Sequence, residues 1–321
     1  MGTRYGAGMA KRPQVTVLGS LNMDISVTVP QLPGPGMTVL GSAATFTPGG
    51  KGANQAVAAA RLGADVLMTG CVGDDDFGRQ LLDGLRAGGV DGGGVRVAAG
   101  AATGLAMISV DEAGENIITV APGANHQVGD CDVDRAIASQ HDVLVISAEI
   151  PVPVIRSALA AARGTRSVLN LAPAPAQAAA IVADGVDWLV VNESEAAAIL
   201  GQPVDGLAGA AQAAAALVTA GARCAVVTAG AHGAALAGRD SALDDVISVP
   251  AFRVEAVDTV GAGDTFVGAL AVALAAGVPA PEAVRAAAAA GATAATRHGA
   301  QAGMPRPADI AAITGLTWPV A

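Results

Sequence analysis

A glycine-rich turn near the end of the chain combines a place for an anion with a carboxylate. Residues 258–266, with the sequence DTVGAGDTF, lead directly into an apolar stretch that is typical of a helix. The small residues Gly261, Ala262 and Gly263 would present backbone N–H groups at the positive end of that helix, which favours phosphate. Asp264 would repel a phosphate, but a carboxylate beside a phosphoryl group can accept the proton of an attacking hydroxyl. The alternative is that Asp264 only caps the helix.

Two other polar groups fit a ligand site. The turn at 49–55, GGKGANQ, offers Lys51 and Asn54 as donors at the start of a predicted helix, although a simple turn would look the same. Asn22 and Asp24 follow the first predicted strand, at the edge where open α/β sheets bind ligands. They could hold neighbouring hydroxyls of a sugar as donor and acceptor, or form only an Asx turn.

Two common phosphate-binding patterns are missing. The first strand leads into GSLNMD instead of the GxGxxG of dinucleotide-binding folds. The nearest approach to a P-loop has Gly52 where Ser or Thr is needed and Thr45 where the first glycine belongs. Dehydrogenase and P-loop interpretations are therefore disfavoured.

The elements that must position these groups alternate between short apolar strands and alanine-rich helices. Strands that are apolar on both faces and separated by helices indicate a parallel sheet covered on both sides. Strands are predicted at 15–19, 65–69, 142–147, 167–171, 188–191 and 224–228. Helices are predicted at 52–62, 75–87, 207–220, 265–276 and 286–296.

Two regions depart from this alternation of apolar strands and helices. Residues 24–30 and 38–47 alternate as half-exposed strands do, and 104–110 with 115–120 would form a hairpin around the turn at 111–114. A small antiparallel sheet standing off the main sheet would fit this pattern. Such a sheet commonly serves as a lid over a cleft.

The composition raises the question of a membrane protein, because 52% of the 321 residues are hydrophobic and only 14% are charged. The best candidate span, 265–281, is too short and contains Gly268, Gly277 and Pro279. We expect no membrane span and, from the polar start of the chain, no secretory signal. A net charge of −10 without basic blocks disfavours nucleic acid as a partner.

The cysteines and histidines predict neither a redox motif nor a zinc site. Cys71, Cys131 and Cys224 lie in or near apolar runs without CxxC spacing, which indicates buried thiols in a reducing, cytoplasmic compartment. The four histidines are scattered without paired ligand spacing.

Taken together, the motifs resemble those of the ribokinase family of carbohydrate kinases. They occur in the family's order over about residues 15–313, and two of them are long glycine motifs that are specific to the family. The motifs are GSLNMD (19–24), PGGKGANQAVAAARLGA (48–64), GCVGDDDFG (70–78), GANHQV (123–128), AEIP (148–151), NLAPAPA (170–176), VNESEA (191–196), TAGAHG (228–233) and DTVGAGDTFVGAL (258–270).

The resemblance implies a three-layer ribokinase-like α/β core with a mostly parallel central sheet and a small antiparallel β-sheet lid. It implies a homodimer formed through the lid. We expect a flexible leader over 1–13 and a single kinase domain over 14–316, with lid strands from about 22–48 and 101–124.

The resemblance also assigns roles to individual residues. Asp264 would be the base. The anion hole for the γ-phosphate would be formed by Gly261, Ala262, Gly263 and Asp264. The sugar would be held by Asn22, Asp24, Gly50, Lys51, Asn54 and Glu149. The ATP site would consist of Asn192, Thr228, Ala229, Gly230, Ala231, His232, Gly233, Gly263 and Ala288. Glu195 would organise Mg²⁺ through water. A monovalent cation such as K⁺ would lie near Asp258, Val260, Ala294, Arg297, Gly299 and Gly303.

The implied reaction is transfer of a phosphoryl group from ATP to the 5-hydroxyl of D-ribose, which gives D-ribose 5-phosphate and ADP. The motifs around Asn22 and Asp24, GGKGANQ and NLAPAPA favour ribose, while deoxyribose, a nucleoside or a keto-sugar remain open as acceptors. A non-catalytic sugar or nucleotide sensor is disfavoured because Asp264 and the small residues before it are intact. Without the resemblance, Glu149 and Glu195 would be a strand-end charge and a helix N-terminal carboxylate.

Overall fold

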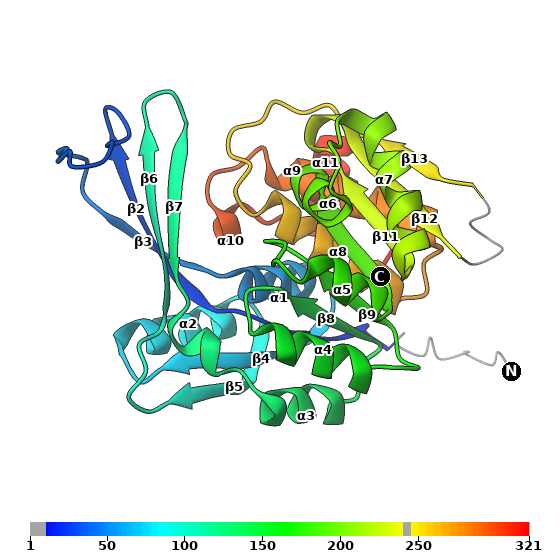
Figure 1. Cartoon of the computed structure of the whole chain (residues 1–321), viewed down its shortest axis with the longest axis horizontal. Coiled ribbons are helices and arrows are strands. Elements are labelled where there is room, and N and C mark those ends of the chain that lie inside the picture. Colours follow the sequence, from blue (N-terminus) through cyan, green and yellow to red (C-terminus); the bar gives the residue numbers. More distant parts are fainter. Residues whose placement is uncertain (1–10, 240–244, 321) are drawn as a thin grey trace, which may run out of the picture.

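Two β-sheets organise the residues that the computed structural model describes, 11–239 and 245–320. The larger sheet has nine strands with helices on both faces, and the smaller one has four strands and projects away from it (Figure 1). The structure therefore has the three-layer α/β core and the separate small sheet that the sequence predicts. Of the predicted leader, residues 1–10 lie outside the described residues.

The larger sheet is mostly parallel. Its order is β13-β12-β11-β10-β9-β8-β1-β4-β5, and only β12 and β13 at one edge run antiparallel to their neighbours. The strands are β1 (Gln14–Leu18), β4 (Asp65–Gly73), β5 (Val90–Ala98), β8 (Val143–Ser147), β9 (Ser167–Asn170), β10 (Val186–Asn192), β11 (Ala222–Thr228), β12 (Gly233–Gly238) and β13 (Ile247–Pro250).

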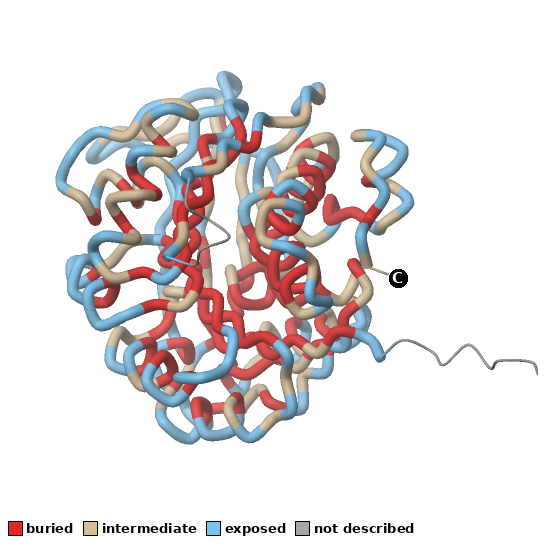
Figure 2. The backbone as a smooth tube through the Cα atoms, turned by 90° about the vertical axis from the view of Figure 1, so that its right-hand side faces the viewer, coloured by how far each residue is buried: buried red, intermediate tan, exposed pale blue. Residues whose placement is uncertain are grey.

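Alternate residues of each central strand enter opposite layers of the core. In β8, Val143 and Val145 belong to one apolar cluster, while Leu144 and Ile146 belong to the other, and all four are buried. Figure 2 shows buried backbone running through the middle of the molecule, with the exposed segments outside it. Burial on both faces explains why these strands read as continuous apolar runs.

The helices divide between the two faces. Side chains of α1 (Lys51–Arg61), α2 (Asp76–Ala87), α8 (Ala262–Ala275), α9 (Ala280–Ala294) and α11 (Pro307–Thr314) enter the first cluster. Side chains of α3 (Asp130–Ala138), α4 (Val152–Ala161), α5 (Ala178–Ala183), α6 (Glu193–Leu200) and α7 (Gly206–Ala220) enter the second. Short segments η1 (Gly123–Gln127), η2 (Gly230–His232) and α10 (Ala300–Gly303) complete the described chain.

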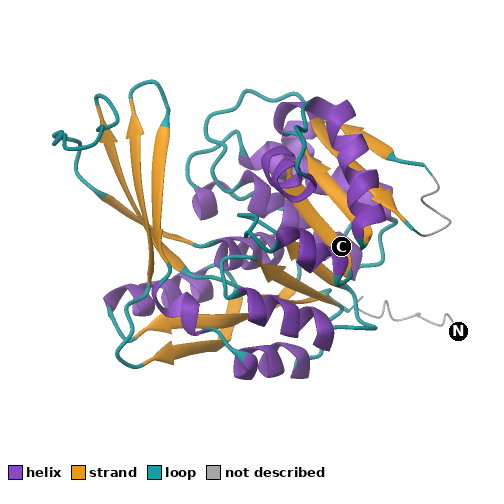
Figure 3. Ribbon diagram, viewed as in Figure 1, coloured by secondary structure: helices purple, strands orange, loops and turns teal. Residues whose placement is uncertain are grey.

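The smaller sheet has the order β3-β2-β6-β7, and Figure 3 shows its strands extending away from the core. It consists of β2 (Asn22–Val29), β3 (Thr45–Gly49), β6 (Gly104–Asp111) and β7 (Asn116–Ala121). The predicted hairpin around 111–114 is confirmed by the antiparallel pairing of β6 with β7. The central pair, β2 with β6, is parallel, because the chain passes through the main sheet between them.

Three local predictions need correction. Of the strand predicted at 38–47 only Thr45 to Thr47 belongs to β3, because the register shifts by one residue beyond Thr45. There the Ser42 amide donates to the Thr28 carbonyl at 2.8 Å, and the Ser42 hydroxyl accepts from the Thr28 amide at 3.0 Å. Cys71 and Cys224 are buried, but Cys131 is exposed at the start of α3. Helix α9 begins at Ala280, before the predicted 286, with Pro281 in its first turn where a missing N–H costs little.

No helix of the described residues has the length and apolar character needed to cross a bilayer.

Candidate active site

Asp264 lies in the first turn of α8, where α8 meets the start of α1. Its side chain is buried, and both carboxylate oxygens accept hydrogen bonds from α1. Asn54 Nδ2 donates to Oδ2 at 2.9 Å, and Gln55 Nε2 donates to Oδ1 at 3.1 Å. The residue that caps α8 is Gly261, and no side chain caps this helix. Asp264 therefore does not serve as the cap, which was the alternative that the sequence left open.

The start of α8 depends on a left-handed turn at Gly261. Its φ is +77°, and a Cβ at this position would lie 2.8 Å from the Cα of Ala300. The amide of Ala262 donates to the carbonyl of Thr259 at 3.2 Å, so one of the predicted anion-hole amides already has a partner. The amides of Gly263 and Asp264 follow in the first turn, where a helix leaves N–H groups unpaired. Space beside Gly263 is open, since no atom outside its own turn lies within 4 Å of where a Cβ would be.

Glu149 connects three of the segments that form the site. Its Oε2 accepts hydrogen bonds from the Ser20 hydroxyl at 2.6 Å, from the Lys51 amide at 3.1 Å and, at 3.5 Å, from Asn22 Nδ2. Asn22 Oδ1 in turn accepts from Asn125 Nδ2 at 2.7 Å. The predicted sugar-binding residues Asn22 and Glu149 are thus brought together at the carboxyl ends of β1 and β8.

Glycines allow the backbone to approach these side chains closely. Gly50 has a φ of +87°, and a Cβ there would lie 2.6 Å from the amide nitrogen of Asn22. Gly49 faces the carboxylate of Asp24 so closely that a Cβ would overlap it. The two glycines therefore allow α1 to begin directly beside β2.

Four carboxylates, those of Asp24, Glu149, Glu195 and Asp264, and the ammonium group of Lys51 share this region. The pKa of Asp24 is raised to about 7, chiefly by burial and then by the negative charges of Glu149 and Asp264. The pKa of Lys51 is raised, first by the charge of Asp264 and against the opposing effect of burial. The pKa of Glu195 is raised by burial, although its hydrogen bond from the Asn192 amide and the charge of Lys51 act in the other direction. These couplings place Lys51 among the acidic groups.

Most of the predicted nucleotide residues lie at the carboxyl ends of β10 and β11, while Gly263 lies in α8 and Ala288 in α9. Asn192 and Thr228 are direct neighbours across these two strands. Asn192 caps α6, where its Oδ1 accepts from the Glu195 amide and Glu195 Oε2 accepts from the Asn192 amide, both at 2.9 Å. Segment η2, with Gly230, Ala231 and His232, is exposed and is flanked by Ala229 and Gly233. The last predicted residue, Ala288 on α9, is partly buried.

Most of the predicted monovalent-cation residues lie together. Asp258 accepts hydrogen bonds from the amides of Val260 at 2.9 Å and Gly299 at 2.8 Å. A Cβ on Gly303 would lie 3.2 Å from the carbonyl oxygen of Arg297 and 3.4 Å from that of Ala294. The guanidinium of Arg297 pairs with Asp309 at 2.9 Å, so only its carbonyl could face an ion.

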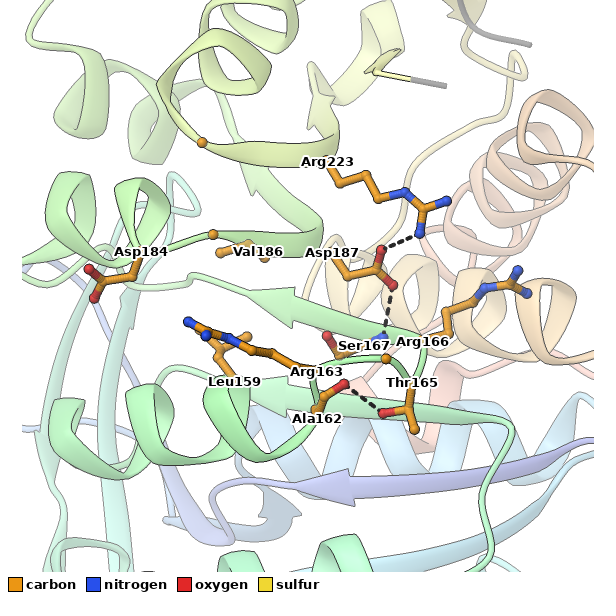
Figure 4. Close-up of a pocket in the computed structure, with 13 residues that line it drawn as sticks. Leu159, Ala162, Arg163, Thr165, Arg166, Ser167, Asp184, Val186, Asp187 and Arg223 are labelled. Atoms are coloured by element: carbon orange, nitrogen blue, oxygen red, sulfur yellow. Dashed lines mark hydrogen bonds and ion pairs between the residues drawn. The ribbon is translucent and has the colours of Figure 1, made fainter. Parts of the chain in front are cut away.

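A separate pocket of about 530 Å³ lies at the opposite, amino-terminal edge of the sheet (Figure 4). It contains none of the predicted site residues. Its acidic groups already have partners: Asp187 pairs with Arg223 and accepts from the Ser167 amide, and Asp184 pairs with Arg156. This pocket is therefore distinct from the group of predicted site residues around Asp264, at the carboxyl ends of the strands.

Sequence reasoning missed four polar contacts in the site. Ser20, Gln55, Asn125 and Asn170 all lie within recognised motifs, but no role was assigned to them. Asn125 accepts from the Leu21 amide at 2.9 Å, and Asn170 accepts from Gln55 Nε2 at 2.9 Å. The partners are far apart in the chain, so local spacing could not show them.

Comparison with known proteins identifies the family to which the chain belongs. The pattern of the pfkB family carbohydrate kinases matches residues 12–307. The ribokinase of Haemophilus influenzae is 36% identical over 302 residues, which are 92% of this chain and 96% of that protein. A deoxyribokinase of Salmonella typhi is 36% identical over 261 residues, 80% of this chain and 84% of that protein. The structure of Arabidopsis thaliana ribokinase complexed with ribose and ATP is similar with a TM-score of 0.81 at 29% identity, and covers 95% of this chain and 100% of that one.

Proposed function

Because the chain belongs to the pfkB family and is a ribokinase-type carbohydrate kinase, we propose that it transfers the γ-phosphoryl group of ATP to the 5-hydroxyl of D-ribose. The observation that carries the proposal is the buried Asp264 carboxylate beside the open first turn of α8. A base and a set of amide donors at one point are what phosphoryl transfer asks of a protein.

In the proposed reaction, Asp264 accepts the proton of the sugar hydroxyl as its oxygen attacks the γ-phosphorus. The bond from the γ-phosphorus to the bridging oxygen breaks, and ADP leaves with the electron pair. The amides of Gly263 and Asp264 at the start of α8 would donate to the equatorial phosphoryl oxygens, where charge is spread in the transition state. Lys51 adds a positive charge near the same carboxylate.

The proposed cofactors suit the oxygen-rich groups on this side of the fold. Mg²⁺ would neutralise phosphate charge, and Glu195 would reach it through water; such ions keep several waters and need few protein carboxylates. Among residues 11–239 and 245–320 no three His, Cys, Asp or Glu side chains are grouped as a ready metal site, which fits that kind of binding. K⁺ would be held by the carbonyls of Ala294 and Arg297 near Gly303, with Asp258 fixing the adjoining loop.

The lid supports the proposed homodimer. Its strands expose several large apolar side chains, and a small sheet gains stability when such a face is covered. The strand register places Phe46, Met107 and Ile117 on one face of the sheet and Ile118 and Val120 on the other.

We expect the KM for the sugar to rise as pH falls below about 7. The pKa of Asp24 is raised from 3.8 to about 7, so the folded protein without sugar holds this proton more tightly than the unfolded chain does. The resulting contribution to folding stability is fully present below pH 3.8 and is lost as the pH rises through 7. The ionised carboxylate accepts stronger hydrogen bonds from sugar hydroxyls, and with both oxygens, than the protonated group does, so each pH unit below 7 should raise the sugar KM by up to about tenfold. Initial-rate measurements across this range, with Asp24→Asn as the non-titrating control, test this. A flat profile in the wild type would contradict it.

The acceptor is tested by coupled assays with ribose, deoxyribose, nucleosides and keto-sugars, each in KCl and in NaCl at matched ionic strength. We expect the highest kcat/KM for ribose and faster turnover in KCl. If another acceptor exceeds ribose by more than about tenfold, a difference of about 1.4 kcal/mol, the assignment of ribose is wrong. Equal rates in the two salts would contradict the proposed K⁺ site without affecting the assignment of the acceptor.

A further inference from the structure

A chain of amide side chains surrounds the carboxylate of Asp264. Gln55 Nε2 donates both to Asp264 Oδ1 at 3.1 Å and to Asn170 Oδ1 at 2.9 Å, and Asn170 Nδ2 donates to the carbonyl of Val190 at 3.1 Å. On the other carboxylate oxygen, Asn54 is itself fixed by Gln301, whose Nε2 donates to Asn54 Oδ1 at 3.1 Å. Both oxygens of Asp264 are therefore held by donors whose own orientations are set by the β9 end and by α10.

Close packing of α1 against α8 allows Asn54 and Gln55 to reach the carboxylate of Asp264. Gly268 lies one turn beyond Asp264 on the same face of α8, and a Cβ there would lie 2.7 Å from both the carbonyl oxygen of Gln55 and the Cβ of Ala58. Without a side chain at Gly268, α1 can approach until consecutive residues, Asn54 and Gln55, both reach one carboxylate. The geometry thus depends on the backbones rather than on flexible side chains.

Gln55 is fully buried, and its Oε1 has no hydrogen-bond partner among the described residues. An unpaired buried acceptor usually costs stability, so the contacts at the other end of the amide determine which way it is turned. Turning the amide over would bring Oε1 against the oxygens of Asp264 and Asn170, so these two acceptors fix its orientation.

We infer that Gln55, which is fixed by Asn170, is a positioning residue for the base. It holds the Asp264 carboxylate at one rotation about its Cβ–Cγ bond, and each carboxylate oxygen keeps a lone pair for the acceptor hydroxyl. This inference rests on the proposed role of Asp264 in phosphoryl transfer. The side chain of Gln55 touches the base and not the reacting atoms, so its effect acts through Asp264.

The test is Gln55→Met, which keeps the size of the side chain and removes the amide. We expect kcat to fall by about 10- to 100-fold, because small misplacements of reacting groups have effects of this size, while the KM values for sugar and ATP change by less than about threefold. The melting temperature should also fall, since Asp264 Oδ1 and Asn170 Oδ1 lose a donor, so kcat is measured per folded molecule well below the melting temperature of the variant. A merely structural role would lower the melting temperature in the same way but leave kcat per folded molecule unchanged.

Gln212→Met on the exposed face of α7 is the matched control and should leave kcat unchanged. Gln55→Leu removes the same donor and serves if the methionine variant does not fold. In an Asp264→Asn background, Gln55→Met should change the residual kcat by less than about twofold, because the group that it positions is gone. A kcat near that of the wild type for Gln55→Met, or the same loss in both backgrounds, overturns the inference. If ribose is not the acceptor, assays of the wild type alone will show it. The comparison of the single variants with the double variant then uses the acceptor that the wild type phosphorylates.

Discussion

Replacing Asp264 with Asn is expected to lower kcat by about 10²- to 10⁴-fold, the usual contribution of a positioned base. The amide matches the carboxylate in shape but cannot accept the proton of the acceptor hydroxyl. The sugar and ATP should still bind, because Asn22, Glu149 and the residues around Asn192 are unchanged. The loss should therefore appear in kcat, with both KM values changed by less than about threefold, in steady-state kinetics with the best acceptor of the panel.

The substitution also changes the contacts of a buried group. The new NH₂ group would face one of the donors that now serve the carboxylate, Asn54 or Gln55, which leaves a donor without an acceptor and costs about 1–3 kcal/mol. The assay is therefore run well below the melting temperature of the variant. Asp205→Asn, at an exposed position before α7, removes the same charge elsewhere and should retain the wild-type kcat. Turnover by Asp264→Asn within about tenfold of the wild type would exclude Asp264 as the base.

The position of this carboxylate at the start of a helix could be read from the sequence, but its environment could not. The motif at 258–266 predicts a helix start with an acidic residue, and the structure has it. Whether that acid caps the helix or faces a site depends on Asn54 and Gln55, which are about 210 residues away and meet it only through the packing of α1 on α8. Local spacing carries no information on such a contact.

The same distinction explains what was and was not predicted in the fold. Central strands such as β8 are buried on both faces, so composition and length alone indicate them. The smaller sheet is harder to predict because its strands are largely exposed and the pairing partner decides their length. A one-residue shift in register at Ser42 limits the β2–β3 ladder, and the parallel pairing of β2 with β6 follows from the path of the chain through the core.

Alanine in place of Gly261 is expected to lower kcat by about 10²- to 10³-fold, which is the effect of removing a donor from a preorganised charge-stabilising site. Two physical effects act together. An L-residue in the left-handed conformation costs about 1–2 kcal/mol, and the new Cβ would lie 2.8 Å from the Cα of Ala300 in α10. Neither backbone can yield easily, because the neighbouring Gly299 amide is bound to Asp258. The first turn of α8 would have to move, and with it the amides of Gly263 and Asp264 and the base.

Gly277 offers a matched control at the other end of the same helix. Its φ is +76°, almost equal to that of Gly261, but no atom lies within 4 Å of where its Cβ would be. Gly277→Ala should therefore have the same cost of the left-handed backbone, about 1–2 kcal/mol, and keep kcat within about twofold of the wild type. Thermal unfolding and steady-state kinetics of the two variants separate backbone strain from displacement of the site. If Gly261→Ala loses stability like Gly277→Ala and keeps its kcat, the first turn of α8 does not serve as the anion hole.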